Sequence, residues 1–157
     1  MSEASPFGSR PAVSPGFLLW RTTLHWQREV AAALKPLGLT HVQFVLLASV
    51  WWLTEQARTP AELPSQTQAA TYAETDVMMT SSVLRTLESR GLVTRTADPA
   101  DARVKRLAVT DEGRRRALDA VAVVEAVDLA FFSRARDRDQ VLDVLRQLAG
   151  VPPEVSP

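Results

Sequence analysis

Aspartates and arginines share one short turn of the sequence, in a spacing that suits contact with nucleic acid. The segment RTADPADARVKRLAVT, residues 95–110, alternates like a strand at each end and turns at Asp98 and Pro99. An arginine at the tip of such a hairpin, here Arg103, can enter a narrow minor groove, where the potential is most negative. Asp101 would accept hydrogen bonds from that guanidinium and fix its direction. The alternative is an exposed ion pair of little consequence.

A second group of candidate side chains lies on residues 76–90, for which the spacing predicts a helix. One side should pack on the core through an apolar stripe of Met79, Val83, Leu84 and Leu87. The other side carries, at helical spacing, Met78, Ser81, Ser82 and Arg85. Short hydroxyls let a helix sit deep in a major groove, and arginine can bind guanine through two hydrogen bonds. An ordinary polar surface is the alternative for this face.

Phosphate contacts are expected on both sides of that helix. Ser65, Gln66 and Thr67 begin a short preceding helix and offer backbone N–H groups to an anion. Lys105 and Arg106 point to opposite sides of a strand, so only one of them should face a DNA backbone. Nine of the 18 basic residues fall between residues 85 and 116, against five acids, although the formal net charge is zero. A solvated charged face would show the same local excess.

The composition excludes several other classes of function. The 157 residues, 46% apolar and 23% charged, suit one globular domain. There is no cysteine, so disulfides, thiol chemistry and peroxide sensing through a thiol are ruled out. His25 and His41 are far apart without carboxylates at metal-site spacing, and we expect no metal, no cofactor and no enzyme. The run 42–53 is too short to span a bilayer, which predicts a cytoplasmic protein with no membrane partner.

Capping and turn residues divide the chain into elements. We expect a flexible tail over 1–13 and helices over 14–34, 40–55, 65–74, 76–90, 110–133 and 139–148. Strands are expected over 92–97 and 104–110, with a short strand possible at 62–63, and a C-terminal tail over 150–157. A short helix, a tight turn, a second helix and a two-stranded hairpin in this order are typical of a winged helix-turn-helix.

The run from LTHVQFVLLASV through LPSQTQAATYAETDVMMTSSVLRTLESRGLVTRTADPADARVKRLAVTDEGR resembles the MarR family of bacterial transcriptional regulators. The resemblance covers residues 39–116 well. It implies a mostly α-helical fold with a small β-hairpin wing: a winged helix-turn-helix lobe over 39–109 and a helical dimerisation region over 14–38 and 110–149. It implies a homodimer, acting as a repressor, that binds a palindromic operator with helix 76–90 and wing 95–109. The two recognition helices would lie roughly 34 Å apart, one turn of DNA.

Residue by residue, the resemblance assigns Ser81 and Arg85 to base contacts, Ser65 and Thr80 to phosphate contacts, and Asp101 with Arg103 to the wing tip. Ser81 stands where a longer side chain is common, so base readout is expected to shift to other side chains. Residues 110–133 are apolar nearly all round, which agrees with a second subunit packing there. A winged-helix protein-interaction module without specific DNA binding is the competing hypothesis.

Relatives in this family commonly respond to small aromatic or phenolic ligands, and the chain concentrates aromatic groups where such a ligand would bind. The candidate effector residues are Trp20, His25, Trp26, Trp51 and Trp52. Stacked indoles beside a histidine could hold an aromatic carboxylate. Packing in the core or at the dimer interface is the alternative for each of these tryptophans.

Overall fold

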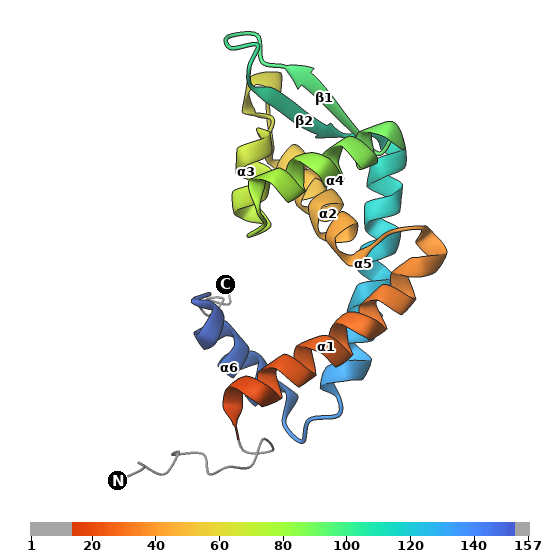
Figure 1. The fold of residues 1–157 in the computed structure, drawn as a ribbon, viewed down its shortest axis with the longest axis vertical. Coiled ribbons are helices and arrows are strands. Elements are labelled where there is room, and N and C mark those ends of the chain that lie inside the picture. The colour runs from red at the N-terminus through yellow and green to blue at the C-terminus, as the bar shows by residue number, and fades with distance from the viewer. Residues whose placement is uncertain (1–13, 153–157) are drawn as a thin grey trace.

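The computed structural model describes residues 14–152, so the expected tail over 1–13 and the last five residues lie outside the described part. Six α-helices and one hairpin follow in the expected order (Figure 1). They are α1 (Pro15–Leu34), α2 (His41–Gln56), α3 (Gln66–Tyr72), α4 (Val77–Ser89), β1 (Val93–Ala97), β2 (Lys105–Val109), α5 (Asp111–Phe132) and α6 (Arg138–Ala149). Short 3-10 turns span Lys35–Leu37 and Pro60–Glu62. The prediction of a mostly helical fold with a hairpin wing is confirmed.

The helices begin at the predicted capping residues. Ser14 accepts a hydrogen bond from the first turn of α1, and Thr40 and Ser65 each form a complete capping box, at the starts of α2 and α3. Asp76 caps α4 by accepting from the backbone N–H groups of Met78 and Met79, both at 2.9 Å. These side chains satisfy donors that have no partner inside the helix.

One helix joins the two ends of the elongated molecule. In Figure 1, α5 runs from the hairpin end, where α2, α3 and α4 gather, down to its crossing with α1. The core is continuous along that path, from Leu84, Leu87 and Leu107 in the lobe to Val30 and Leu34 of α1. The lobe and the helical region are therefore mechanically connected through α5.

The junction between hairpin and α5 requires a glycine. A Cβ atom on Gly113 would lie 1.8 Å from the backbone oxygen of Leu92, far inside van der Waals contact. Thr110 closes the same junction, because its hydroxyl donates to the carbonyl of Gly91 at 2.7 Å and accepts from the N–H of Gly113 at 2.9 Å. The spacing of Thr110 and Gly113 thus fixes where the wing leaves the long helix.

The hairpin pairs Val93 with Val109 and Ala97 with Lys105 in an antiparallel register. The prediction of a short strand at 62–63 is wrong, since Pro60–Glu62 forms a 3-10 turn. Strand-like pairing occurs instead just beyond it, where Ser65 bridges to Arg106 and the carbonyl of Pro64 accepts from the N–H of Leu107 at 2.8 Å. A proline keeps its acceptor while losing its donor, so it can take part in one such bond only.

Large apolar side chains are exposed at the end of the molecule away from the wing. Residues 110–133 were expected to carry more apolar surface than one subunit could bury: α5 buries Ala117, Ala120 and Val124 but leaves Leu118 and Leu129 46% and 52% exposed. The larger exposed sets are Phe17, Leu18, Leu19 and Trp20 of α1, and Leu142, Val144, Leu145 and Leu148 of α6. None of the residues in α6 is buried. Within residues 14–152, no single helix is long and apolar enough to cross a membrane.

Candidate nucleic-acid interface

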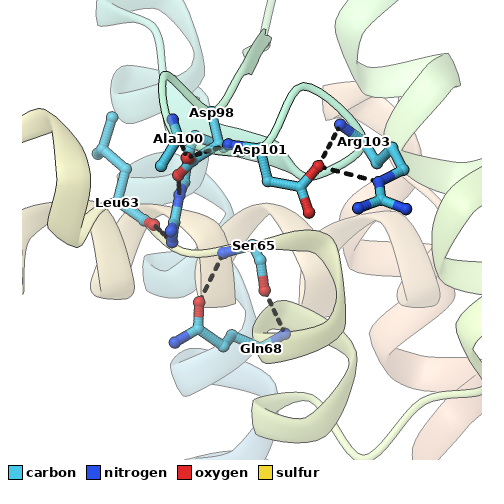
Figure 2. Close-up of polar contacts among 8 residues, drawn as sticks. Leu63, Ser65, Gln68, Asp98, Ala100, Asp101 and Arg103 are labelled. Atoms are coloured by element: carbon cyan, nitrogen blue, oxygen red, sulfur yellow. Dashed lines mark hydrogen bonds and ion pairs between the residues drawn. The ribbon is translucent and has the colours of Figure 1, made fainter.

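A buried carboxylate organises the turn of the wing. One oxygen of Asp98 accepts from the backbone N–H groups of Ala100 at 2.7 Å and Asp101 at 3.1 Å (Figure 2). Its other oxygen accepts from Nε of Arg106, whose Nη1 also donates to the carbonyl of Leu63 at 2.9 Å. This Asp98–Arg106 clamp ties the wing to the loop that enters α3. The expected division of the two basic residues of β2 is confirmed: Arg106 is held inside, while Lys105 is exposed.

The clamp predicts an acid-sensitive wing. The Arg106 guanidinium and the two backbone N–H groups hold the pKa of Asp98 below its ordinary value. The stabilisation is therefore complete above the ordinary pKa of aspartate and is lost as the pH falls below it, through the lowered value of the folded state. We expect the amide signals of Ala100 and Asp101 in an NMR titration to report loss of order only at acid pH. Asp98→Asn should remove this dependence and leave a loosened wing at neutral pH.

The same titration can contradict the prediction. If the amides of Ala100 and Asp101 shift at acid pH equally in Asp98→Asn, another group controls the turn. Asp111 is a suitable control, because it is an exposed carboxylate outside the wing. Asp111→Asn should leave the wing signals as they are in the unaltered protein.

The tip of the wing carries the predicted ion pair. Nε of Arg103 donates to Asp101 at 3.1 Å, and the backbone N–H of Arg103 donates to the same oxygen at 3.0 Å (Figure 2). The Arg103 side chain is 92% exposed. Asp101 uses one oxygen to hold both groups, so the predicted orienting contact is confirmed while the guanidinium keeps its Nη donors for a ligand.

A polar hollow of about 350 Å³ opens between the wing, α3 and α4. Its lining includes six of the eleven predicted contact residues, Ser65, Gln66, Thr67, Ser81, Arg103 and Lys105, together with Arg95 and Val104. Three cations therefore face one concave surface, next to the hydroxyls of Ser65, Thr67 and Ser81. An arrangement of guanidinium, ammonium and hydroxyl donors around a hollow suits a phosphate group.

Arg95 is a site residue that the sequence analysis missed. Its Nη atoms make only long contacts of 3.5 Å, to Glu88 and to Gln66, and its buried Nε has no partner within the described residues. Buried donors without a hydrogen-bond partner are uncommon, and here that Nε–H donor belongs to a residue that lines the hollow. The strand pattern could have identified it. Arg95 is the central residue of β1, and side chains alternate between the two faces of a strand, so its position places it on the face toward α3.

Helix α4 presents the predicted face with one correction. Met78, Ser82 and Arg85 are exposed, and Ser81 borders the hollow. Thr80, expected to contact phosphate, is completely buried, and its hydroxyl bonds to the Asp76 carbonyl and the Thr75 hydroxyl, both at 2.8 Å. A side chain without exposed surface and with its hydroxyl already bonded cannot reach DNA in this conformation.

The predicted apolar stripe of α4 is confirmed at Leu84 and Leu87, which are buried, and at Val83, which packs against the core, but it is wrong at Met79. Met79 was expected to pack on the core but is 41% exposed. The buried positions are Thr80, Leu84 and Leu87, which recur at i, i+4 and i+7 and so share one side of the helix. Thr80 is tolerated there because the backbone of its own first turn satisfies its hydroxyl.

The tryptophans do not gather around one pocket, contrary to the expectation. Trp26 packs on the core and donates from Nε1 to Asp128 of α5 at 2.7 Å, and Trp51 also packs on the core. Trp20 and His25 border a groove on α1, and Trp52 is half exposed on α2. Aromatic residues close in sequence thus point to different sides of two crossing helices.

A different groove, of about 480 Å³, lies where the helical region meets the lobe. Its lining consists of Gln27, Ala31, His41, Val42, Val45, Ala73 and Thr75, from α1, α2 and the turn before α4. His41 also packs edge-on against Trp26, with ring centroids 5.1 Å apart. Burial lowers the pKa of His41, an effect that the Asp128 carboxylate opposes, and this favours the neutral ring, which has one N–H to donate.

A short capped helix, a second helix and a hairpin with several cations follow one another as α3, α4, β1 and β2. This order defines the protein as a winged helix-turn-helix protein of the DNA-binding class. The model of the MarR family matches residues 39–105. The HTH-type transcriptional regulator YdcH of Bacillus subtilis is 41% identical over 140 residues, which are 89% of this chain and 92% of the relative. The chain therefore belongs to the MarR family of transcriptional regulators.

Two solved structures extend the comparison. CouR from Rhodococcus jostii RHA1, bound to p-coumaroyl-CoA, is 33% identical, with a TM-score of 0.72 over 95% of this chain and 100% of that one. The MarR family protein Rv2887 of Mycobacterium tuberculosis, in complex with DNA, is 31% identical, with a TM-score of 0.65 over 86% and 97% of the two chains. Rv2887 has also been solved with salicylic acid, where the identity is 33% and the TM-score 0.62 over 88% and 96%.

Proposed function

We propose that this protein is a homodimeric repressor that binds a palindromic operator in the cytoplasm and releases it when a small aromatic acid binds. The observation that carries the proposal is the hollow between the wing, α3 and α4. Arg95, Arg103 and Lys105 converge there from a chain whose net charge is zero. Such local convergence of cations is what phosphate recognition needs.

Each half of the operator would meet two parts of one lobe. Helix α4 enters the major groove with Met78, Ser81, Ser82 and Arg85 toward the bases. The hollow, with Ser65, Gln66 and Thr67 on its α3 side, receives a backbone phosphate. Arg95 and Lys105 contact that phosphate, while Arg103, 92% exposed at the tip of the wing, reaches into the adjacent minor groove. Rv2887 in complex with DNA and CouR bound to a DNA duplex support DNA binding by proteins of this fold.

Dimerisation would use the helical region, 14–38 and 110–149, as the resemblance implies. The exposed apolar residues of α1 and α6 support this placement, because contiguous apolar surface of this kind marks an interaction site. The two sets lie at the end of the molecule away from the wing (Figure 1). A second subunit attached there leaves both DNA-binding lobes free.

The test of DNA binding is a mobility-shift titration with the full-length protein and the region upstream of its own gene. We expect specific retention, with an affinity that falls steeply as salt rises, because bound cations displace counterions from the phosphates. A protein-interaction module would retain no duplex even at low salt. That result would reject the repressor.

The effector would occupy the 480 Å³ groove beside His41. This groove touches α1, α2 and the turn before α4, so a ligand there can change how the lobe sits on the helical region. The Asp128–Trp26–His41 contacts connect the same place to α5. A ligand acts only through its different affinity for the DNA-competent and released conformations.

Salicylate is a suitable probe for this groove, and the two histidines offer a matched pair of variants. We expect salicylate to release the bound duplex, and His41→Gln to require about tenfold more of it, because a hydrogen bond to a charged group contributes roughly 1.5 kcal/mol. His25→Gln should behave like the unaltered protein, since His25 borders the other groove on α1. Equal sensitivity of the two variants would remove His41 from the effector site.

A further inference from the structure

The first turn of α4 exposes apolar side chains at the place where a recognition helix meets base edges. The Met78 side chain is 82% exposed and Val77 is 50% exposed. Ser81 follows Met78 by three residues, and therefore lies near it on the helix surface, and it borders the cationic hollow. The apolar pair thus continues the surface that the proposed function assigns to DNA.

The N-terminus of α4 is unsuited to a phosphate. Asp76 accepts from the N–H groups of Met78 and Met79, so its carboxylate already occupies the donors of that turn. A carboxylate at this point also repels a second anion. In the proposed DNA complex, the group that meets Met78 is therefore an uncharged base edge and not a phosphate.

The side chains of the exposed face differ in what they can distinguish. Serine hydroxyls at 81 and 82 both donate and accept, so they discriminate little among bases. Arg85 favours guanine. Met78 and Val77 offer no hydrogen-bond donor and at most the weakly accepting sulfur of Met78, and among the groups in the major groove the 5-methyl of thymine is the one that an apolar side chain can recognise.

We propose that Met78, supported by Val77, reads a thymine methyl group in each half of the operator. The inference rests on the proposed function and names the base chemistry of its recognition helix. It places part of the sequence specificity on an apolar contact, and this compensates for the short Ser81 at a position where long polar side chains are common. Each operator half then contains a thymine on the Met78 side of the guanine read by Arg85.

Uracil tests the contact directly, because it pairs like thymine and lacks only the methyl group. The probe is a duplex enriched from a random pool by repeated selection with the full-length protein. Each thymine is replaced by uracil symmetrically in both halves. Loss of one buried methyl lowers affinity about fourfold per half, from roughly 0.8 kcal/mol, and about fifteenfold for the whole palindrome. We expect this loss at one position in each half.

Variants of Met78 assign the methyl contact to its side chain. In Met78→Ala, thymine and uracil duplexes should bind equally, whereas Met78→Leu should keep most of the preference because leucine is also apolar. The side chain is exposed, so unfolding and dimerisation should be unchanged in both variants, and both are measured. Equal binding of every uracil duplex by the unaltered protein would overturn the inference, as would a uracil penalty that persists in Met78→Ala. If selection enriches no duplex at all, the repressor function itself is wrong.

Discussion

Replacing Leu145 and Leu148 of α6 by aspartate is expected to convert the protein to monomers and to weaken operator binding by about 100-fold or more. Leu148 is 75% exposed in the single chain, whereas Leu145 is 37% exposed and borders a groove against α5, so the unfolding of the variant subunit is measured beside its sedimentation. A dimer interface would have to bury four added carboxylates, each at a cost of several kcal/mol. The loss of affinity follows because two linked half-site contacts gain roughly 10² to 10⁴ over one.

Sedimentation and the mobility shift measure the two effects of this change. Gln140 and Gln147 provide the matched control, because they are exposed polar residues of the same helix, on a different side from Leu145. Gln140→Asp with Gln147→Asp adds the same charge without removing apolar surface, and it should leave the dimer intact. A Leu145→Asp, Leu148→Asp protein that still sediments as a dimer would exclude α6 from the interface.

Loss of the guanidinium at the wing tip should have the next largest effect. We expect Arg103→Ala to lower operator affinity by about 1–3 kcal/mol while folding and dimerisation stay unchanged. The side chain is 92% exposed and its one ion pair, with Asp101, is exposed too, so it adds little to stability. Arg103→Lys should recover only part of the loss, because lysine lacks the flat fork of donors that fits a narrow groove.

A double-variant cycle tests whether Asp101 acts through Arg103. Asp101→Ala alone should weaken binding, because the guanidinium loses the contact that directs it. In the Arg103→Ala background the same change should add nothing. Arg28→Ala controls for the loss of one positive charge, since Arg28 is an exposed residue of α1. Additive losses from Asp101 and Arg103 would mean that each touches DNA independently.

Thr80, which was misplaced, and Arg95, which was missed, have a common origin. Thr80 and Arg95 are polar, and a linear pattern treats polar residues on helices and strands as surface. Thr80 is buried because its hydroxyl bonds locally to Asp76 and Thr75, which leaves only a small apolar side chain to pack. Arg95 is largely covered because α3 and Glu88 of α4 lie over its strand. Both outcomes depend on which elements pack together, and periodicity within one element does not contain that information.

The sequence alone determined the order of the elements and the contact between Asp101 and Arg103. It also determined where the helices begin, at Ser14, Thr40, Ser65, Asp76 and Thr110. Each depends on residues at most a few positions apart, whose hydrogen bonds form whatever the rest of the chain does. The convergence of Arg95, Arg103 and Lys105 on one hollow was decided only by the tertiary structure. So was the separation of the tryptophans onto different sides of crossing helices. These arrangements depend on how α3, α4, the hairpin and α1 pack along α5, which is set by long-range burial of apolar surface.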